Sequence, residues 1–224
     1  NTQPVMLVAG VAAYRAWLAA GGATPDWVAG HSLGEYAALV AAGSLTLSQA
    51  VPLVRLRAEA MQAAVPVGTG AMAAILGMPA DQVVAHCQAV QQTFAPTSGE
   101  VVEAVNFNDP NQTVIAGSKT AVEQAMAVIK AAGAKRALPL PVSAPFHSSL
   151  MRPAAEKLAT YLASVSLLPP QIPVLNNIDV AAPTDPIAIK DALVRQAFGP
   201  VRWVESVQTL AAKGVTKMVE CGPG

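Results

Sequence analysis

The six residues 30–35, GHSLGE, constrain the fold of this chain more than any other stretch. They follow a short apolar segment, residues 27–29, that is typical of a strand, and they precede an alanine-rich segment, residues 36–42, that is typical of a helix. This context indicates a nucleophile elbow, a tight strand-to-helix turn that holds a Ser at its tip in a strained conformation. A Cβ at Gly30 or at Gly34 is expected to collide with the turn, which explains the two glycines.

The elbow places the hydroxyl of Ser32 at the start of a helix. Free N–H groups and the positive end of the helix dipole lie there, and both stabilise an anion that forms beside the hydroxyl. The sequence therefore predicts that Ser32 is a nucleophile. The alternative hypothesis is an ordinary Ser in a glycine-punctuated turn.

The composition argues against several functional classes. The 224 residues carry 14 basic and 14 acidic side chains, so no net charge attracts nucleic acid or an anionic membrane. No apolar stretch is long enough for a transmembrane helix, and no signal peptide is indicated. Cys87 and Cys221 are far apart, which provides neither a disulfide framework nor a metal-binding spacing. With three His in addition, we expect no metal site, and we expect a location in the reducing cytoplasm.

A helix is predicted from a cap at Thr46 or Ser48 to about Ala64, and a cation interrupts its apolar face. Arg57 would be a partly buried, unpaired charge on this face unless an anion meets it. The alternative hypothesis is an Arg whose stem packs while its guanidinium reaches water. The face has helical spacing and consists of Ala50, Leu53, Arg57, Ala60 and Ala64.

The remaining pattern predicts an α/β fold in which one subdomain is inserted into another. Residues 70–139 have the element order βαββαβ of a ferredoxin-like subdomain, with strands at 71–76, 101–106, 113–116 and 135–138, helices at 80–91 and 119–132, and a turn at 106–111. Residues 1–69 and 140–224 alternate strands and helices, which implies a mainly parallel sheet; beyond the segments above, strands are expected at 172–175 and 217–221 and helices at 4–20, 153–164, 187–198 and 202–212. The chain starts at Asn1 and stops at Gly224 directly after a strand-like run, so we expect both ends to be truncated.

Only one of the three histidines is a good candidate for a general base. His147 follows an extended, proline-rich segment that joins the inserted subdomain to the main domain, and it stands directly before a helix. His86 lies within a predicted helix and is expected at the surface or its boundary, while His31 is expected to point away from Ser32.

Blocks along essentially the whole chain resemble the malonyl-CoA:acyl carrier protein transacylase family. They are residues 30–36, Arg57 with Met61, and residues 68–74, 105–108, 112–117, 139–143 leading to His147, 191–196 and 222–224. The resemblance implies a hydrolase-like α/β domain with an inserted ferredoxin-like subdomain, which agrees with the predicted element order.

The resemblance also implies the catalytic roles. Ser32 would attack the malonyl thioester after losing its proton to His147, and the phosphopantetheine thiol of acyl carrier protein would then take the malonyl group from the acyl-enzyme. His147 would be oriented by a backbone carbonyl, and the matching position is Gln196. Malonyl-CoA is then a substrate, acyl carrier protein is the partner and carries the phosphopantetheine, and no cofactor, nucleic acid or membrane is involved.

The same resemblance implies the substrate contacts. Arg57 would hold the free malonyl carboxylate through a bidentate pair, and the backbone N–H of Leu33 would be one oxyanion donor. Gln112 would lie near the acyl group, and Met61 and Phe146 would belong to the same substrate site. Phe before the His accompanies malonyl rather than methylmalonyl in related domains of polyketide synthases, so Phe146 favours malonyl.

One departure from the family pattern is the lack of its N-terminal Gly-Gln-Gly-Ser-Gln segment, which supplies a second oxyanion donor. We therefore expect an incomplete sheet and a greatly reduced turnover. We also expect a monomer, with Lys130, Lys135 and Arg136 as a landing patch for an acidic carrier protein.

Three alternatives stay open at the level of sequence. A serine esterase would need an Asp or Glu between Ser32 and His147 and would have no use for Arg57. The chain would otherwise be an acyltransferase domain cut from a polyketide synthase, or a non-catalytic module that docks carrier proteins.

Overall fold

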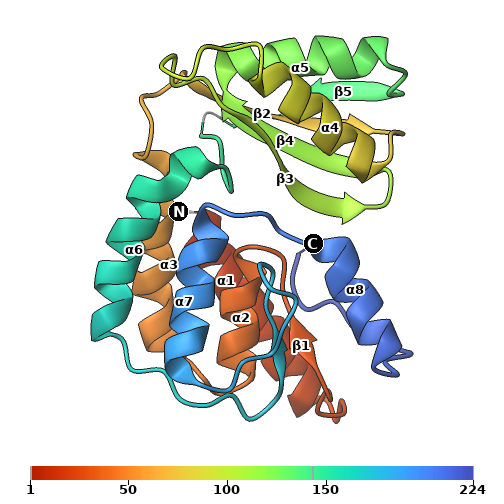
Figure 1. Ribbon diagram of the computed structural model, residues 1–224. Helices are drawn as coiled ribbons and strands as arrows, with labels where there is room; N and C mark the ends of the chain where they lie inside the picture. Colours follow the sequence, from red (N-terminus) through yellow and green to blue (C-terminus); the bar gives the residue numbers. More distant parts are fainter. Residues whose placement is uncertain (1, 143, 224) are drawn as a thin grey trace. The chain divides into compact units, whose positions relative to one another are not determined.

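The computed structural model describes residues 2–142 and 144–223, which form two compact units (Figure 1). Unit 1 consists of Asn1–Glu59, Glu156–Val194 and Glu205–Gly224. Unit 2 consists of Ala60–Ala155 and Arg195–Val204.

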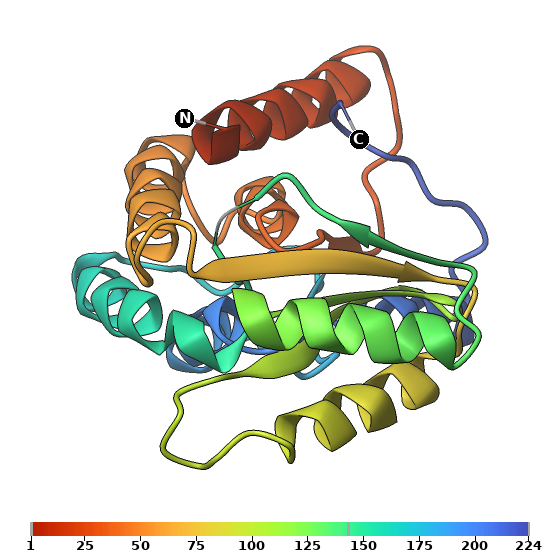
Figure 2. The same ribbon diagram turned by 90° about the horizontal axis from the view of Figure 1, so that it is seen from above.

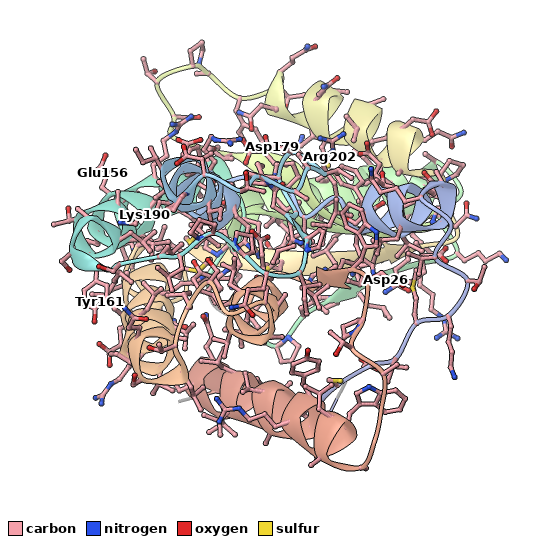
Figure 3. All side chains as sticks on the ribbon, turned by 90° about the horizontal axis from the view of Figure 1, so that it is seen from below. Asp26, Glu156, Tyr161, Asp179, Lys190 and Arg202 are labelled. Atoms are coloured by element: carbon pink, nitrogen blue, oxygen red, sulfur yellow. The ribbon has the colours of Figure 1, made fainter. Side chains whose placement is uncertain are left out.

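Unit 1 is a helical unit built around a short parallel strand pair. Strand β1 (Val28–Ala29) pairs in parallel with β6 (Val174–Leu175), with Val28 opposite Val174, as expected for the alternation of strands and helices. Helix α1 packs on α2. The charged side chains of Asp26 and Glu156, which Figure 3 labels, are exposed. The helices that lie wholly or mostly in this unit are α1 (Thr2–Ala19), α2 (Gly34–Ala41), α3 (Leu47–Gln62), α6 (Arg152–Ser164), α7 (Pro186–Ala197) and α8 (Trp203–Ala212).

Unit 2 contains a four-stranded antiparallel sheet in the order β3-β4-β2-β5. Figures 1 and 2 show helices α4 and α5 on the same face of this sheet, where Ile75, Val83, Ile115 and Ile129 form a buried core. The elements follow one another as β2 (Gly70–Leu76), α4 (Ala80–Gln91), β3 (Val102–Asp109), β4 (Gln112–Ser118), α5 (Lys119–Ala131) and β5 (Arg136–Pro139), and a 3-10 helix (Ser149–Met151) precedes α6. This is the predicted βαββαβ order.

The turn expected at residues 106–111 is largely strand, so this prediction is wrong. Strand β3 continues to Asp109 because it pairs with β4 through two register shifts, after Ala104 and after Phe107. The Phe107 N–H also donates to the Val201 oxygen at 3.0 Å, which adds a further partner on the other side. Asn, Asp and Pro are depleted in strands, so the composition of this segment favoured a turn. Only residues 110–111 form the turn.

The strand expected at residues 217–221 is absent, and this prediction is also wrong. No strand of residues 2–142 and 144–223 pairs with this segment, and the side chains of Met218 and Val219 are about half exposed. An apolar run forms a strand only where a neighbouring strand accepts its backbone hydrogen bonds.

Two helix starts illustrate how the predicted caps behave. At α3, the Gln49 N–H donates to Thr46 Oγ1 at 3.2 Å and the Thr46 N–H donates to Gln49 Oε1 at 3.0 Å, a reciprocal capping box. At α5, Ser118 occupies the cap position, but its hydroxyl accepts from the Val101 N–H at 2.8 Å instead. Among the described residues, no helix is long and apolar enough to cross a membrane.

Candidate functional site

The turn after β1 holds Ser32 in a strained backbone conformation. Its φ angle is 51°, in the left-handed region that residues with a Cβ seldom adopt. The turn is closed by Gly34 N–H, which donates to the His31 oxygen at 2.8 Å, and by Glu35 N–H, which donates to the Ser32 oxygen at 3.2 Å. The tip of the elbow is thus built from local hydrogen bonds around one strained residue.

The two glycines of the elbow have different reasons to be glycine. A Cβ at Gly30 would overlap the carbonyl group of Gly34 and would come within 2.6 Å of the Glu35 nitrogen. A Cβ at Gly34 would meet nothing within 4 Å. The expectation that both positions exclude a side chain is therefore wrong for Gly34. The chain folds back so that its backbone lies against Gly30, whereas the space beside Gly34 is open.

This asymmetry predicts the effects of two matched substitutions. Gly30→Ala is expected to lower the free energy of unfolding by more than about 3 kcal/mol, because backbone atoms must move. Gly34→Ala is expected to change it by less than about 1 kcal/mol, since alanine is favourable in the first turn of α2. Urea unfolding of both variants measures this difference, and equal losses would contradict a collision with backbone at Gly30 alone.

Arg57 is buried beside the Ser32 hydroxyl. Its side chain is 2% exposed, its Nη2 donates to Ser32 Oγ at 3.0 Å, and its Nη1 donates to Gln3 Oε1 at 2.8 Å. The guanidinium also lies over the ring of Tyr36, 5.4 Å from its centroid. The alternative in which Arg57 reaches water is wrong, and a buried cation at the nucleophile candidate makes this place attractive to an anion.

Burial raises the pKa of Tyr36 to about 12, and the Arg57 charge opposes this shift only in part. A buried phenolate is unfavourable, so Tyr36 contributes stability that is fully present below pH 10 and is lost as the pH rises from 10 through 12. We expect the free energy of unfolding to fall by up to about 1 kcal/mol more per pH unit above pH 10 in the wild-type chain than in Tyr36→Phe. Urea titrations at several alkaline pH values measure the difference, and parallel curves would contradict it.

In unit 2, His147 is held at its Nδ1 by the backbone of Gln196. The distance from His147 Nδ1 to the Gln196 oxygen is 2.8 Å, and the two side chains are 4% and 0% exposed. A carbonyl oxygen only accepts hydrogen bonds, so Nδ1 carries the proton and the neutral ring presents Nε2 as a proton acceptor. This is the arrangement that a general base requires.

The loop around His147 is strained, and a carboxylate from the sheet binds its backbone. His147 has a φ angle of 66°, and the Ser148 hydroxyl donates to the Pro145 oxygen at 2.6 Å. The Ser149 N–H donates to Glu103 Oε2 at 2.7 Å. Glu103 comes from β3, so only tertiary structure brings it to this loop.

The other predicted site residues are distributed over both units. Leu33 follows Ser32 in unit 1, and among the described residues nothing accepts a hydrogen bond from its N–H. Met61 and Phe146 pack in one apolar cluster of unit 2 with Met151. Gln112 is exposed at the first position of β4. Ser32 and Arg57 are thus paired in unit 1, and His147 and Gln196 are paired in unit 2.

Asn177 contacts the elbow at Ser32 and Gly30, and Glu35 binds the backbone of Asn177; neither residue was identified from the sequence as a site residue. Asn177 follows β6, and the carboxyl ends of the parallel strands β1 and β6 meet at one edge, which is where ligands bind in open α/β sheets. Two consecutive asparagines after a predicted strand were the available indication. Among residues 2–142 and 144–223, no group of three His, Cys, Asp or Glu side chains could hold a metal ion.

The chain matches the acyl transferase domain family over residues 1–223. The malonyl CoA-acyl carrier protein transacylase of Escherichia coli K12 is 54% identical over 224 residues, which cover 100% of this chain and 71% of that protein. A crystal structure of the acyl-carrier-protein S-malonyltransferase from Burkholderia pseudomallei has 63% identity and a TM-score of 0.96, with 100% of this chain and 71% of that chain covered.

A second similar structure contains a partner. It is a type II polyketide synthase acyl-carrier protein in complex with its malonyl-transacylase, with 51% identity, a TM-score of 0.94, and 100% of this chain and 70% of that chain covered. These similarities extend over the whole chain and include both units. The chain therefore belongs to the acyl transferase domain family and, within it, to the malonyl CoA-acyl carrier protein transacylases.

Proposed function

We propose that this chain transfers the malonyl group of malonyl-CoA to the phosphopantetheine thiol of acyl carrier protein, through a malonyl ester on Ser32. The observation that carries this proposal is the buried Arg57 guanidinium, which donates to Ser32 Oγ at 3.0 Å. A buried cation at the nucleophile suits an acyl group with a free carboxylate, and the relatives are named for malonyl transfer. The product supplies extender units for fatty acid synthesis.

The first half-reaction forms the ester. Ser32 Oγ attacks the thioester carbonyl while its proton passes to His147 Nε2, and the carbonyl oxygen becomes an oxyanion. The Leu33 N–H, which has no acceptor among the described residues, donates to this oxyanion. The C–S bond then breaks, and the CoA sulfur leaves with the proton from His147.

The second half-reaction uses the same groups in the reverse sense. The phosphopantetheine thiol gives its proton to His147 Nε2 and attacks the ester, and the proton then returns to Ser32 Oγ. Throughout, the Gln196 carbonyl holds the Nδ1–H, which stabilises the imidazolium. Arg57 binds the malonyl carboxylate with two parallel N–H donors, so the Gln3 amide gives up its contact with Nη1 when the substrate binds.

We also propose that the two units correspond to a hydrolase-like domain and an inserted ferredoxin-like subdomain. Unit 1 resembles a hydrolase-like domain in its parallel strand pair, elbow and surrounding helices. The order β3-β4-β2-β5 with α4 and α5 on one face is that of a ferredoxin-like subdomain, with proposed domain boundaries of 1–69 and 140–224 for the first and 70–139 for the second. No cofactor beyond the substrates is needed, and we propose a monomer that works in the cytoplasm.

One of the three cations predicted to bind the carrier protein is engaged within this chain. Lys130 Nζ donates to the backbone oxygens of Ala134 and Lys135 at 3.2 and 2.6 Å, so this ammonium is bound to the segment that follows α5. Lys135 and Arg136 are exposed and are the cations proposed to face the acidic carrier protein. Phe146 is proposed to favour malonyl as the acyl group, and Gln112 is proposed to lie near this group.

One assay separates this function from that of a serine esterase. The purified protein is incubated with malonyl-CoA and phosphopantetheinylated acyl carrier protein, and the malonyl carrier protein is quantified by mass spectrometry; p-nitrophenyl acetate serves as the neutral ester. We expect malonyl transfer to exceed ester hydrolysis. Hydrolysis of the neutral ester without acylation of the carrier protein would contradict the proposal.

A further inference from the structure

One side chain from a remote segment spans the elbow on both sides of its tip. Asn177 Oδ1 accepts the backbone N–H of Ser32 at 2.6 Å, and Asn177 Nδ2 donates to the Gly30 oxygen at 2.8 Å. Asn177 is fully buried, at 0% exposure. The amide therefore clamps the residue that enters the turn and the residue at its tip, from a segment about 145 positions away in sequence.

The clamp is itself held by the helix that leaves the elbow. Glu35 lies in the first turn of α2 and is 2% exposed, and its Oε2 accepts the backbone N–H of Asn177 at 2.9 Å. Hydrogen bonds to a carboxylate are stronger than those between neutral groups. The strand end, the tip and the helix start are thus joined through a single residue, all within unit 1.

This arrangement matters because the tip is strained and its N–H is partly buried. A non-glycine residue at a φ angle of 51° persists only where its surroundings impose that angle, because the conformation is strained. A buried N–H without an acceptor would add a second cost. The Asn177 amide accepts this N–H and so removes the second cost. It also opposes relaxation of the strained backbone of Ser32.

We propose that Asn177 is a positioning residue, which acts through the backbone of Ser32 to aim the hydroxyl at the acyl group. This inference rests on the proposed function for the identity of the reaction, but not for the geometry. It also has a consequence for the oxyanion. The N–H of Ser32 is directed to Asn177, so the first donor in this turn is the N–H of Leu33.

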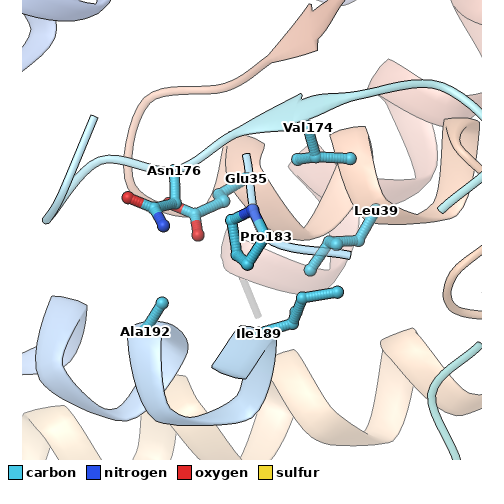
Figure 4. A pocket seen from close by; sticks show the side chains of 7 residues that line it. All are labelled: Glu35, Leu39, Val174, Asn176, Pro183, Ile189 and Ala192. Carbon is cyan, nitrogen blue, oxygen red and sulfur yellow. The ribbon is translucent and has the colours of Figure 1, made fainter. Parts of the chain in front are cut away.

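The neighbouring residue provides a matched control. Asn176 is on the same loop, and its Oδ1 accepts the Asp179 N–H at 2.8 Å. Together with Glu35, Leu39 and Ile189 it lines a small cavity of about 10 Å³ (Figure 4). Asn176 makes no hydrogen bond to residues 30–34. Replacing Asn176 perturbs the same loop without releasing the elbow.

The experiment compares Asn177→Ala, Asn177→Asp and Asn176→Ala with the wild-type protein, each below its own unfolding temperature. Two rates are measured: malonyl transfer, resolved into kcat and KM, and covalent labelling of Ser32 by a fluorophosphonate. For Asn177→Ala we expect both kcat and the labelling rate to fall about 100-fold, with the KM for malonyl-CoA within about threefold of the wild-type value. Asn177→Asp keeps an acceptor for the Ser32 N–H and is expected to recover about tenfold of that loss. Asn176→Ala is expected to stay within about twofold of the wild-type rates.

Each outcome decides the matter. Rates for Asn177→Ala within threefold of the wild-type values would overturn the proposal, and so would equal losses in Asn177→Ala and Asn176→Ala, which would show a general effect of the loop. If Asn177→Ala does not fold, the same comparison is made between Asn177→Asp and Asn176→Ala, and equal rates overturn the proposal. If the wild-type protein labels but transfers no malonyl group, the proposed function fails, while the labelling rates still decide the role of Asn177.

Discussion

Ser32→Ala is expected to abolish malonyl transfer, with a fall in kcat of at least about 10⁴-fold, because no other hydroxyl is held at the tip of the elbow to form the acyl ester. Mass spectrometry of the intact protein after incubation with malonyl-CoA is expected to show one malonyl adduct on the wild-type chain and none on the variant. Ser44→Ala is the matched control, since Ser44 is also buried in unit 1 but its hydroxyl donates to Leu168 at 2.7 Å. An adduct on Ser32→Ala would contradict the assignment of the nucleophile.

The same assay tests whether the pair in unit 1 and the pair in unit 2 work as one catalytic group. His147→Ala is expected to reduce kcat by about 10³-fold or more, because the proton acceptor Nε2 is lost. In the double variant with Ser32→Ala, the loss of kcat is expected to be no greater than in Ser32→Ala alone. The effects of substituting residues that act as one catalytic group are not additive. Independent, multiplying losses would show that His147 does not serve Ser32.

Arg57→Ala is expected to remove the preference for malonyl over acetyl. Removing one partner of a buried guanidinium–carboxylate pair costs about 2–5 kcal/mol, so kcat/KM for malonyl-CoA should fall by about 30- to 5,000-fold. Acetyl-CoA has no free carboxylate, and its use should change little. Competition between the two thioesters for the same protein, read from the acyl adducts on Ser32, measures the change.

Two further variants sharpen this test. Arg57→Lys retains the charge but cannot make two parallel hydrogen bonds, and it is expected to give an intermediate preference. Arg55 lies two positions away on α3 and pairs with Glu59 at 2.9 Å at the surface, so Arg55→Ala should leave the preference unchanged. An unaltered preference in Arg57→Ala would refute the role of Arg57 as the carboxylate clamp.

Local sequence patterns predicted the elements whose conformation depends on residues close together in the chain. The glycine-flanked Ser32, the helical spacing of α3 with Arg57 in its apolar face, and the span of α4 at Ala80–Gln91 all follow from residues a few positions apart. The element order of unit 2 was predictable for the same reason. The end of β3 and the absence of a strand at 217–221 were not, because a strand is defined by its neighbour.

Residues a few positions apart were enough to predict a strained serine between a strand and a helix, and a cation at helical spacing that requires a partner. The groups that surround this serine could not be predicted in this way, because they come from distant segments of the chain. Asn177 binds the elbow through three hydrogen bonds between residues 142 to 147 positions apart, and Gln3 reaches Arg57 across 54 positions. Contacts of this range leave no period or spacing in the sequence, because they form only when the packing of β1 against β6 and of the helices brings the segments together.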